Sequence, residues 1–168
     1  MRAGIALGSN LGDRLANLRQ ACGEVLALPT ISAPAMTSRV YETDPIDSDR
    51  DAPRYLNAVL EVEFAGQPMT LLDDLQGIEA AMGRPSKRPR NASRIIDLDI
   101  LYVGNLALAN SEVVIPHPRL PMRRFVLQPL SDLRPELVLP GQHASIAELL
   151  EQLPAGERVD PIGESLSL

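Results

Sequence analysis

Two aspartates, Asp97 and Asp99, stand one residue apart inside an apolar run that extends from Ile95 to Val103. β-Branched and aromatic residues without Gly or Pro predict a buried strand here. Because strand side chains alternate between faces, the two carboxylates point the same way, with their Cα atoms about 6–7 Å apart. Two carboxylates this close in a dry site repel each other, and a divalent cation removes that conflict. Hard oxygen ligands with few other protein donors suit Mg²⁺, which takes its remaining ligands from water and substrate phosphates. The alternative is a strand at a sheet edge whose aspartates are solvated or paired with arginine.

A basic segment lies just upstream of this strand. Five of the 16 basic residues of the chain fall within eleven positions, namely Arg84, Lys87, Arg88, Arg90 and Arg94. Residues 83–93 include Gly, Ser, Asn and two Pro, a composition that favours a loop. Guanidinium groups bind phosphate oxygens in bidentate fashion, so a basic loop that leads into a two-carboxylate strand has the groups to hold a magnesium polyphosphate. A solvated charged loop is the alternative.

The whole chain has the composition of one globular domain, with 168 residues of which 45% are apolar and 23% are charged. Its net charge of −6 argues against a broad nucleic-acid surface, so the basic segment is a local feature that suits a small polyanion. Cys22 is the only cysteine, which argues against a disulfide framework, and its helical spacing places it in the core. No apolar stretch approaches membrane-spanning length and no signal-peptide profile is visible, so we expect a cytoplasmic monomer that binds neither nucleic acid nor a membrane.

The elements that must position these residues follow from the hydrophobic periodicity. We expect helices over residues 13–28 and 69–82, and strands over residues 3–9, 37–42, 55–64 and 95–103. This β-α-β-β-α-β order predicts an α+β fold of the ferredoxin-like type, an α/β sandwich with an antiparallel sheet. Both helices should pack on one face of the sheet, which leaves the other face for ligands and loops.

Several segments carry more local expectations. Ser9 or Asn10 can cap the first helix, and residues 29–34, which include two prolines, should interrupt the chain after it. Beyond Val103 we expect an irregular, proline-rich C-terminal extension with a short helix over 145–153. Residues 154–168 should form a peripheral tail of the single domain 1–168.

Three residues near this extension could contact phosphate. His117 lies between two prolines, and such rigidity would hold an imidazole in place near phosphate; a turn histidine that caps a backbone carbonyl is the alternative. Arg123 and Arg124 could add phosphate contacts, although one of the two should only pack or be solvated.

Three other residues could contact a flat ligand. Tyr55 and Phe125 are two of the few aromatic residues, and they could stack on a ligand or pack in the core. A buried amide at Asn57 needs partners, which a ligand with a donor–acceptor edge would supply.

Together these segments resemble the 6-hydroxymethyl-7,8-dihydropterin pyrophosphokinase family, in the family's own order from about Arg2 to Pro140. The matching segments are residues 6–13, 55–58, 78–79 with 83–84, 94–101, 115–119 and 123–127. The Arg-x-x-Asp-x-Asp strand and the Pro-His-Pro-Arg segment are specific in combination. One departure is Asn91-Ala92-Ser93, where the family usually has Trp-Gly-Pro.

The resemblance implies an ATP-dependent diphosphokinase of folate biosynthesis that transfers pyrophosphate from ATP to the hydroxymethyl group of the pterin and releases AMP. It implies two Mg²⁺ ions on Asp97 and Asp99, with Arg84 and Arg94 as catalytic arginines. The implied ATP-binding residues are Gln76, Glu79, Arg84, Arg94, Ile100, His117 and Arg123. The implied pterin-binding residues are Thr43, Asp44, Pro45, Ile46, Tyr55, Asn57 and Phe125.

Two other functions fit parts of this pattern. A ferredoxin-like RNA-binding or regulatory module would need surface aromatics on its central strands, and this aromatic-poor chain offers few. A magnesium-dependent kinase that transfers only the γ-phosphate to another small alcohol is the enzymatic alternative.

Overall fold

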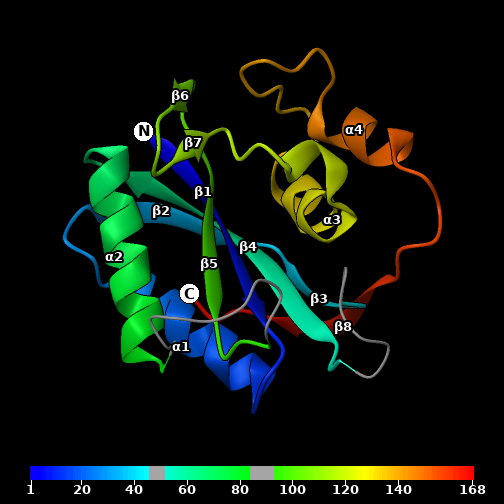
Figure 1. Cartoon of the computed structure of the whole chain (residues 1–168), viewed down its shortest axis with the longest axis horizontal. Coiled ribbons are helices and arrows are strands. Elements are labelled where there is room, and N and C mark those ends of the chain that lie inside the picture. The colour runs from blue at the N-terminus through cyan, green and yellow to red at the C-terminus, as the bar shows by residue number, and fades with distance from the viewer. Residues whose placement is uncertain (46–51, 84–92) are drawn as a thin grey trace.

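The computed structural model describes residues 1–45, 52–83 and 93–168. Its centre is an antiparallel sheet in the order β5-β1-β4-β3-β8, in which β2 also pairs with β4 (Figure 1). The strands of this sheet are β1 (Arg2–Ser9), β2 (Ile31–Thr37), β3 (Arg39–Thr43), β4 (Tyr55–Phe64), β5 (Asp97–Val103) and β8 (Val159–Ser165). Two short strands, β6 (Leu108–Ala109) and β7 (Val114–Ile115), form a separate ribbon.

The helices are α1 (Arg14–Leu26), α2 (Pro68–Ala81), α3 (Arg124–Leu133) and α4 (Ile146–Gln152), with a 3₁₀ turn η1 over Leu120–Met122. Helix α1 begins after Asp13, whose side chain accepts a hydrogen bond from the backbone N–H of Ala16 at 3.0 Å. The prediction that Ser9 or Asn10 caps this helix is therefore wrong. Helix α2 begins with Pro68, which suits a first turn because the N–H groups there have no intrahelical acceptor.

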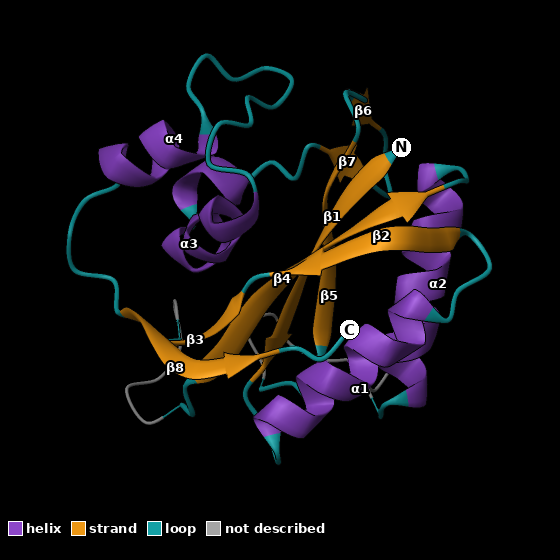
Figure 2. Ribbon diagram, turned by 180° about the vertical axis from the view of Figure 1, so that it is seen from behind, coloured by secondary structure: helices purple, strands orange, loops and turns teal. Residues whose placement is uncertain are grey.

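The ferredoxin-like prediction is confirmed by the chain order and by the sheet. Helices α1 and α2 pack on one face, over a core that includes Ile5, Leu7 and Leu60. The other face carries α3 and α4, which pack over a second core around Val59 and Leu127 (Figure 2). The C-terminal extension thus covers part of the face that we expected to be left to ligands and loops, because its amphipathic helices bury their own apolar side chains there.

Polar contacts fix α3 to the sheet. Glu61 on β4 is only 4% exposed, and Arg134, directly after α3, forms an ion pair with it at 2.6 Å. The hydroxyl of Tyr102 on β5 donates to the same carboxylate. Asp132 near the end of α3 accepts a hydrogen bond from the Tyr41 hydroxyl of β3 at 2.9 Å. These contacts set the position of α3, and therefore of the side chains at its N-terminal end.

The strands depart from the predicted ones in two places. Residues 31–36, most of which we expected to interrupt the chain, belong to β2; Pro34 is accommodated because the pairing with β4 shifts register between Ser32 and Met36. The predicted tail contains β8, which pairs with β3 as an edge strand. Among the described residues, no helix has the length and apolar character needed to cross a membrane.

Candidate active site

The sheet brings a predicted metal-binding residue and a predicted pterin-binding residue into one row across three strands. Gly8 on β1 lies opposite Asn57 of β4 on one side and Asp97 of β5 on the other. Side chains directly opposite in an antiparallel sheet share a face, so Asp97 and Asn57 lie on the same face, the one that carries α3. Two residues further along β1, on the same face, Ala6 separates Asp99 from Val59 in the same way. Small residues in β1 therefore leave space between the carboxylates and the amide.

Gly8 shows how close this space is to being filled. A Cβ atom added at Gly8 would lie 2.9 Å from Oδ1 of Asn57 and 3.8 Å from Cδ1 of Tyr55. Real Cβ atoms do not approach other atoms so closely, so the amide of Asn57 uses room that only glycine provides. This arrangement fixes the floor of a site between β4 and β5.

Each predicted metal-binding aspartate lies next to an arginine. Nη1 of Arg94 is 2.6 Å from Oδ1 of Asp97, and Nη1 of Arg123 is 3.9 Å from Oδ2 of Asp99. The two carboxylates keep exposed fractions of 26% and 42%, so a ligand can still reach them. β5 is also an edge strand of the sheet. Together, the edge position and the two arginine contacts match the alternative to a metal site that we gave from the sequence.

The charges on the two arginines respond differently to their surroundings. Burial works against the charged form of Arg94, but the Asp97 carboxylate outweighs it and raises the pKa of Arg94. Burial lowers the pKa of Arg123, and Asp99 offsets this only in part. Both guanidiniums remain charged at neutral pH, because the ordinary arginine pKa is very high. The site therefore presents two cations beside two anions.

His117 is held against β5 by its backbone. Its N–H donates to the carbonyl of Leu101 at 2.8 Å, and its ring Nδ1 accepts from the backbone N–H of Arg119 at 3.1 Å. Burial, together with the charges of Arg123 and Arg119, lowers the pKa of His117 to about 4. The ring is therefore neutral at physiological pH and carries its proton on Nε2, which can donate to an anion. The ring thus accepts from a backbone N–H and does not cap a backbone carbonyl, the contact expected in the alternative, and Nε2 keeps its proton for another acceptor.

Three of the predicted pterin residues, Thr43, Tyr55 and Asn57, lie together at the β3–β4 end of the row. Asn57 is 8% exposed, and its Nδ2 donates to Oγ1 of Thr43 at 2.6 Å. Thr43 in turn pairs with Tyr55 across β3 and β4. Burial raises the pKa of Tyr55, against the opposing charge of nearby Arg94. Phe125, at the start of α3, lies under the guanidinium of Arg123, with Cζ 5.4 Å from the ring centroid.

Other predicted residues lie elsewhere or cannot be placed. Ile100 is 5% exposed and packs in the core under α1 and α2, away from the carboxylate face. Glu79 is buried on α2, and its Oε1 accepts the backbone N–H of Leu98 at 2.8 Å, while Gln76, one turn earlier, is exposed. Asp44 and Pro45 follow β3 and are partly buried. Arg84 and Ile46 lie outside the described residues, as do Asn91 and Ala92.

The two neighbouring arginines after the 3₁₀ turn divide as the sequence predicted. Arg123 lies beside Asp99, whereas Arg124 donates from Nη2 to the carbonyl of Leu153 at 3.1 Å, close to the end of α4. Arg124 is therefore a packing residue that joins α3 to α4.

Asn10 is a site residue that the sequence did not reveal. Its side chain is 3% exposed; Oδ1 accepts the backbone N–H of Arg94 at 2.6 Å, and Nδ2 donates to the carbonyl of Pro53 at 3.3 Å. Nδ2 also lies 3.3 Å from Oγ of Ser93. One amide thus ties the residues before β4 to those before β5. The only sequence signal is an Asn in a Gly-Ser-Asn-Leu-Gly turn, which also suits a helix cap.

The fold and this set of side chains define a ferredoxin-like α+β domain with a site that has the chemistry to hold a polyphosphate beside a flat, hydrogen-bonding ligand. Residues 4–135 match the family model of the 7,8-dihydro-6-hydroxymethylpterin-pyrophosphokinases (HPPK). The chain belongs to this family, which confirms the resemblance seen in the sequence.

The similarity to individual relatives agrees with this family assignment. The 2-amino-4-hydroxy-6-hydroxymethyldihydropteridine pyrophosphokinase of Haemophilus influenzae is 39% identical over 88% of this chain and 90% of its own length. The enzyme of the same name from Methylorubrum extorquens is 37% identical over 95% of this chain and 99% of its own length. Wild-type Plasmodium falciparum HPPK-DHPS, solved with pteroate, matches the fold with a TM-score of 0.69 and 16% identity; the match covers 89% of this chain but only 42% of that longer chain. At this identity, the structural match supports the fold alone.

Proposed function

We propose that this protein transfers pyrophosphate from ATP to the hydroxymethyl group of 6-hydroxymethyl-7,8-dihydropterin and releases AMP, a step of folate biosynthesis. The observation that carries this proposal is the row of Asp97, Gly8 and Asn57, which sets a carboxylate pair and a pterin-reading amide on one face of the sheet. The reaction needs two substrates side by side, and the row has the carboxylate and the amide on opposite sides of Gly8.

The residues around the carboxylates suit the triphosphate. Two same-face carboxylates with partly exposed oxygens fit Mg²⁺, which needs few protein ligands when phosphates supply the others, and we propose that Asp97 and Asp99 hold two such ions. Among the described residues, no group of three or more His, Cys, Asp or Glu side chains could form a closed metal site, which agrees with an open one. The metal supplies charge neutralisation on the phosphates. Arg94, Arg123 and the ring Nε2–H of His117 would bind phosphate oxygens.

Residues of β3 and β4, together with Phe125 of α3, suit the pterin. Tyr55 and Phe125 offer aromatic faces for a flat ring, and Asn57 together with the backbone of Thr43–Pro45 offers donors and acceptors for its edge. In the reaction, the hydroxymethyl oxygen forms a bond to the β-phosphorus of ATP and the bond from that phosphorus to the α,β-bridging oxygen breaks. AMP leaves with that oxygen, and the hydroxyl proton is released. Positioning and charge stabilisation do most of the work in such transfers.

Product analysis tests this function directly. The purified protein, incubated with ATP, Mg²⁺ and the hydroxymethyl pterin, should yield AMP and pterin pyrophosphate in equal amounts. ADP as the product would favour the γ-phosphate kinase, and the absence of any nucleotide product in the presence of the pterin would contradict both enzymatic functions. Asp97→Asn serves as the matched inactive control, since it preserves the shape of the side chain and removes its charge.

The state and location of the enzyme remain part of the proposal. We take the protein to act as a monomer on two small molecules. The net charge of −6 disfavours nucleic acid as a partner, and the single buried cysteine suits the cytoplasm.

A further inference from the structure

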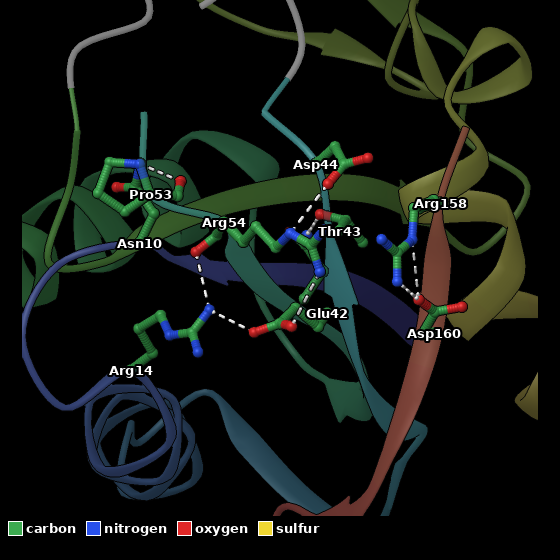
Figure 3. Close-up of polar contacts among 10 residues, drawn as sticks. Asn10, Arg14, Glu42, Thr43, Asp44, Pro53, Arg54, Arg158 and Asp160 are labelled. Carbon is green, nitrogen blue, oxygen red and sulfur yellow. Dashed lines mark hydrogen bonds and ion pairs between the residues drawn. The ribbon is translucent and has the colours of Figure 1, made fainter. Parts of the chain in front are cut away.

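Four charged side chains form a chain of ion pairs at the ends of β3 and β4, which we call the Arg14 cluster: Arg14, Glu42, Asp44 and Arg54 (Figure 3). Nε of Arg54 lies 3.1 Å from Oδ1 of Asp44, and its Nη1 lies 3.4 Å from Oε1 of Glu42. Nη1 of Arg14 lies 2.8 Å from Oε2 of Glu42. The same nitrogen also donates to the backbone carbonyl of Arg54 at 2.9 Å.

The cluster lies directly behind the proposed pterin site. Thr43 stands between Glu42 and Asp44, and Tyr55 follows Arg54. Glu42 pairs with Leu56, whose side chain belongs to the core under α1 and α2, whereas Thr43 pairs with Tyr55. Because side chains alternate along a strand, Glu42 faces α1 while Thr43 faces the site. Arg14, Glu42 and Arg54 therefore do not themselves border the proposed site, whereas Asp44 follows Thr43 and is itself one of the predicted pterin-binding residues.

The contacts of the Arg14 cluster fix the position of the backbone at the ends of β3 and β4. Arg14 is the first residue of α1 and holds the carbonyl immediately before Tyr55, while Arg54 links the residues on both sides of Thr43. The side chains are 28–44% exposed, and ion pairs at such positions add little to global stability. Their effect should instead be geometric, since each one fixes the direction of a strand end.

We propose that the Arg14 cluster positions the ends of β3 and β4 that read the pterin, so that Arg14, Glu42 and Arg54 are positioning residues for this substrate and not for ATP. The inference rests on the proposed function, because it takes Thr43, Tyr55 and Asn57 as the pterin-binding residues. It assigns a role to Arg14, Glu42 and Arg54, none of which is among the site residues predicted from the sequence.

Steady-state kinetics of Glu42→Gln, Arg54→Gln and the double variant test the proposal. Each single variant should raise the KM for the pterin about 3–10-fold and change the KM for ATP less than about twofold, as expected for loss of ground-state positioning of one substrate. The effect of the double variant should be smaller than the product of the two single effects, because both single variants remove the same Glu42–Arg54 contact, while each also removes one contact of its own. Arg54→Lys should restore only part of the affinity, since one ammonium cannot replace both edges of the guanidinium.

Arg158→Gln is the matched control. Arg158 forms an exposed ion pair with Asp160 of β8 at 3.1 Å, in the same region of the molecule (Figure 3). Its removal should leave both KM values unchanged. Equal rises in both KM values of the Glu42 variant, or a pterin KM equal to that of Arg158→Gln, would overturn the proposal.

Hydrogen exchange separates this inference from the proposed reaction. The amides of Thr43, Asp44 and Tyr55 should exchange faster in Glu42→Gln and Arg54→Gln than in the unaltered protein, whatever the substrate is. Unchanged exchange at these amides would overturn the positioning role even if AMP is formed. Faster exchange in a protein that forms no AMP would sustain the positioning of the strand ends and refute the reaction, and with it the assignment to the pterin.

Discussion

Replacement of Asn10 by Ala tests whether its buried amide positions Arg94 for catalysis. The change removes the 2.6 Å acceptor of the Arg94 backbone N–H and the 3.3 Å donor to the carbonyl of Pro53. A buried N–H without an acceptor costs about 1–3 kcal/mol, and the longer bonds add less. We therefore expect a loss of about 2–3 kcal/mol in the free energy of unfolding. For a chain of this length, that loss lowers Tm by about 4–12 °C.

The kinetic effect should exceed the effect on stability. Arg94 is held at its guanidinium by Asp97 and at its backbone by both the side chain and the backbone N–H of Asn10. Loss of the side-chain contact leaves only the backbone bond at 3.0 Å, so the proposed phosphate-binding group can move. A displacement of about 1 Å in such a group can cost up to about 100-fold, and we expect kcat to fall by about 10–100-fold. Asn10→Asp keeps the acceptor for Arg94 and loses only the donor, so it should retain more of kcat than Asn10→Ala.

Asn17→Ala is the matched control for this experiment. Nδ2 of Asn17 donates to the carbonyl of Leu11 at 2.8 Å and to Oγ of Ser9 at 3.2 Å, so it holds the same turn through partners within the turn itself. Urea unfolding and AMP formation would be measured for both variants. If Asn10→Ala keeps kcat within about threefold of Asn17→Ala, a difference of less than 1 kcal/mol in the barrier, Asn10 only stabilises the turn and the reasoning is refuted.

Three further predictions concern other parts of the site. Asp97→Asn and Asp99→Asn should each abolish AMP formation and the Mg²⁺-dependent binding of a non-hydrolysable ATP analogue in calorimetry, while Tm changes by less than about 3 °C; turnover within about tenfold of the unaltered protein would contradict the metal assignment. In His117→Gln, the free energy of unfolding should depend less on pH between about 4 and 6.5, because the native pKa of His117 lies below its ordinary value of 6.5 and protonation of the unfolded chain lowers stability as pH falls through this range. An unchanged slope in denaturation curves measured across this range would show that the folded ring titrates normally. Gly8→Ala should raise the KM for the pterin about 5–30-fold, the equivalent of one displaced amide hydrogen bond, and leave the KM for ATP unchanged, since its Cβ would meet Asn57 Oδ1 at 2.9 Å. An unaltered pterin KM would exclude Asn57 as the amide that binds this substrate.

The strands with strong hydrophobic patterns could be predicted from sequence, and the interrupted ones could not. Residues 55–64 form β4 as predicted, because a long run of β-branched and apolar residues has no competing local structure. β2 was missed because Pro34 usually marks a break, and its place beside a register shift depends on β4, which is distant in sequence. β8 was missed because it is exposed, carries Pro161 and Gly163, and is a strand only through pairing with β3.

Some features of the candidate site could likewise be predicted from the sequence, and others could not. The carboxylates of Asp97 and Asp99 stood out because charges inside an apolar strand conflict with burial, and they do share a face. Glu79 could be found from the family resemblance, but not its contact with the backbone N–H of Leu98, which decides what that buried carboxylate touches. Ile100 alternates to the opposite face from Asp99, a fact that strand periodicity alone could have supplied.

There is a physical reason why ligand-binding residues can be predicted from sequence more easily than the residues that position them. A side chain that binds a ligand must keep unsatisfied hydrogen-bonding capacity or charge near the surface, so its type conflicts with its apolar neighbours and can be seen locally. A side chain that positions it is satisfied by backbone groups elsewhere, as Asn10 is by Arg94, 84 residues away. In the sequence such a residue looks like any polar residue of a turn, since its partners are set by tertiary structure. The Arg14 cluster follows the same rule: Glu42 and Arg54 are 12 residues apart, and only the pairing of β3 with β4 brings their charges together.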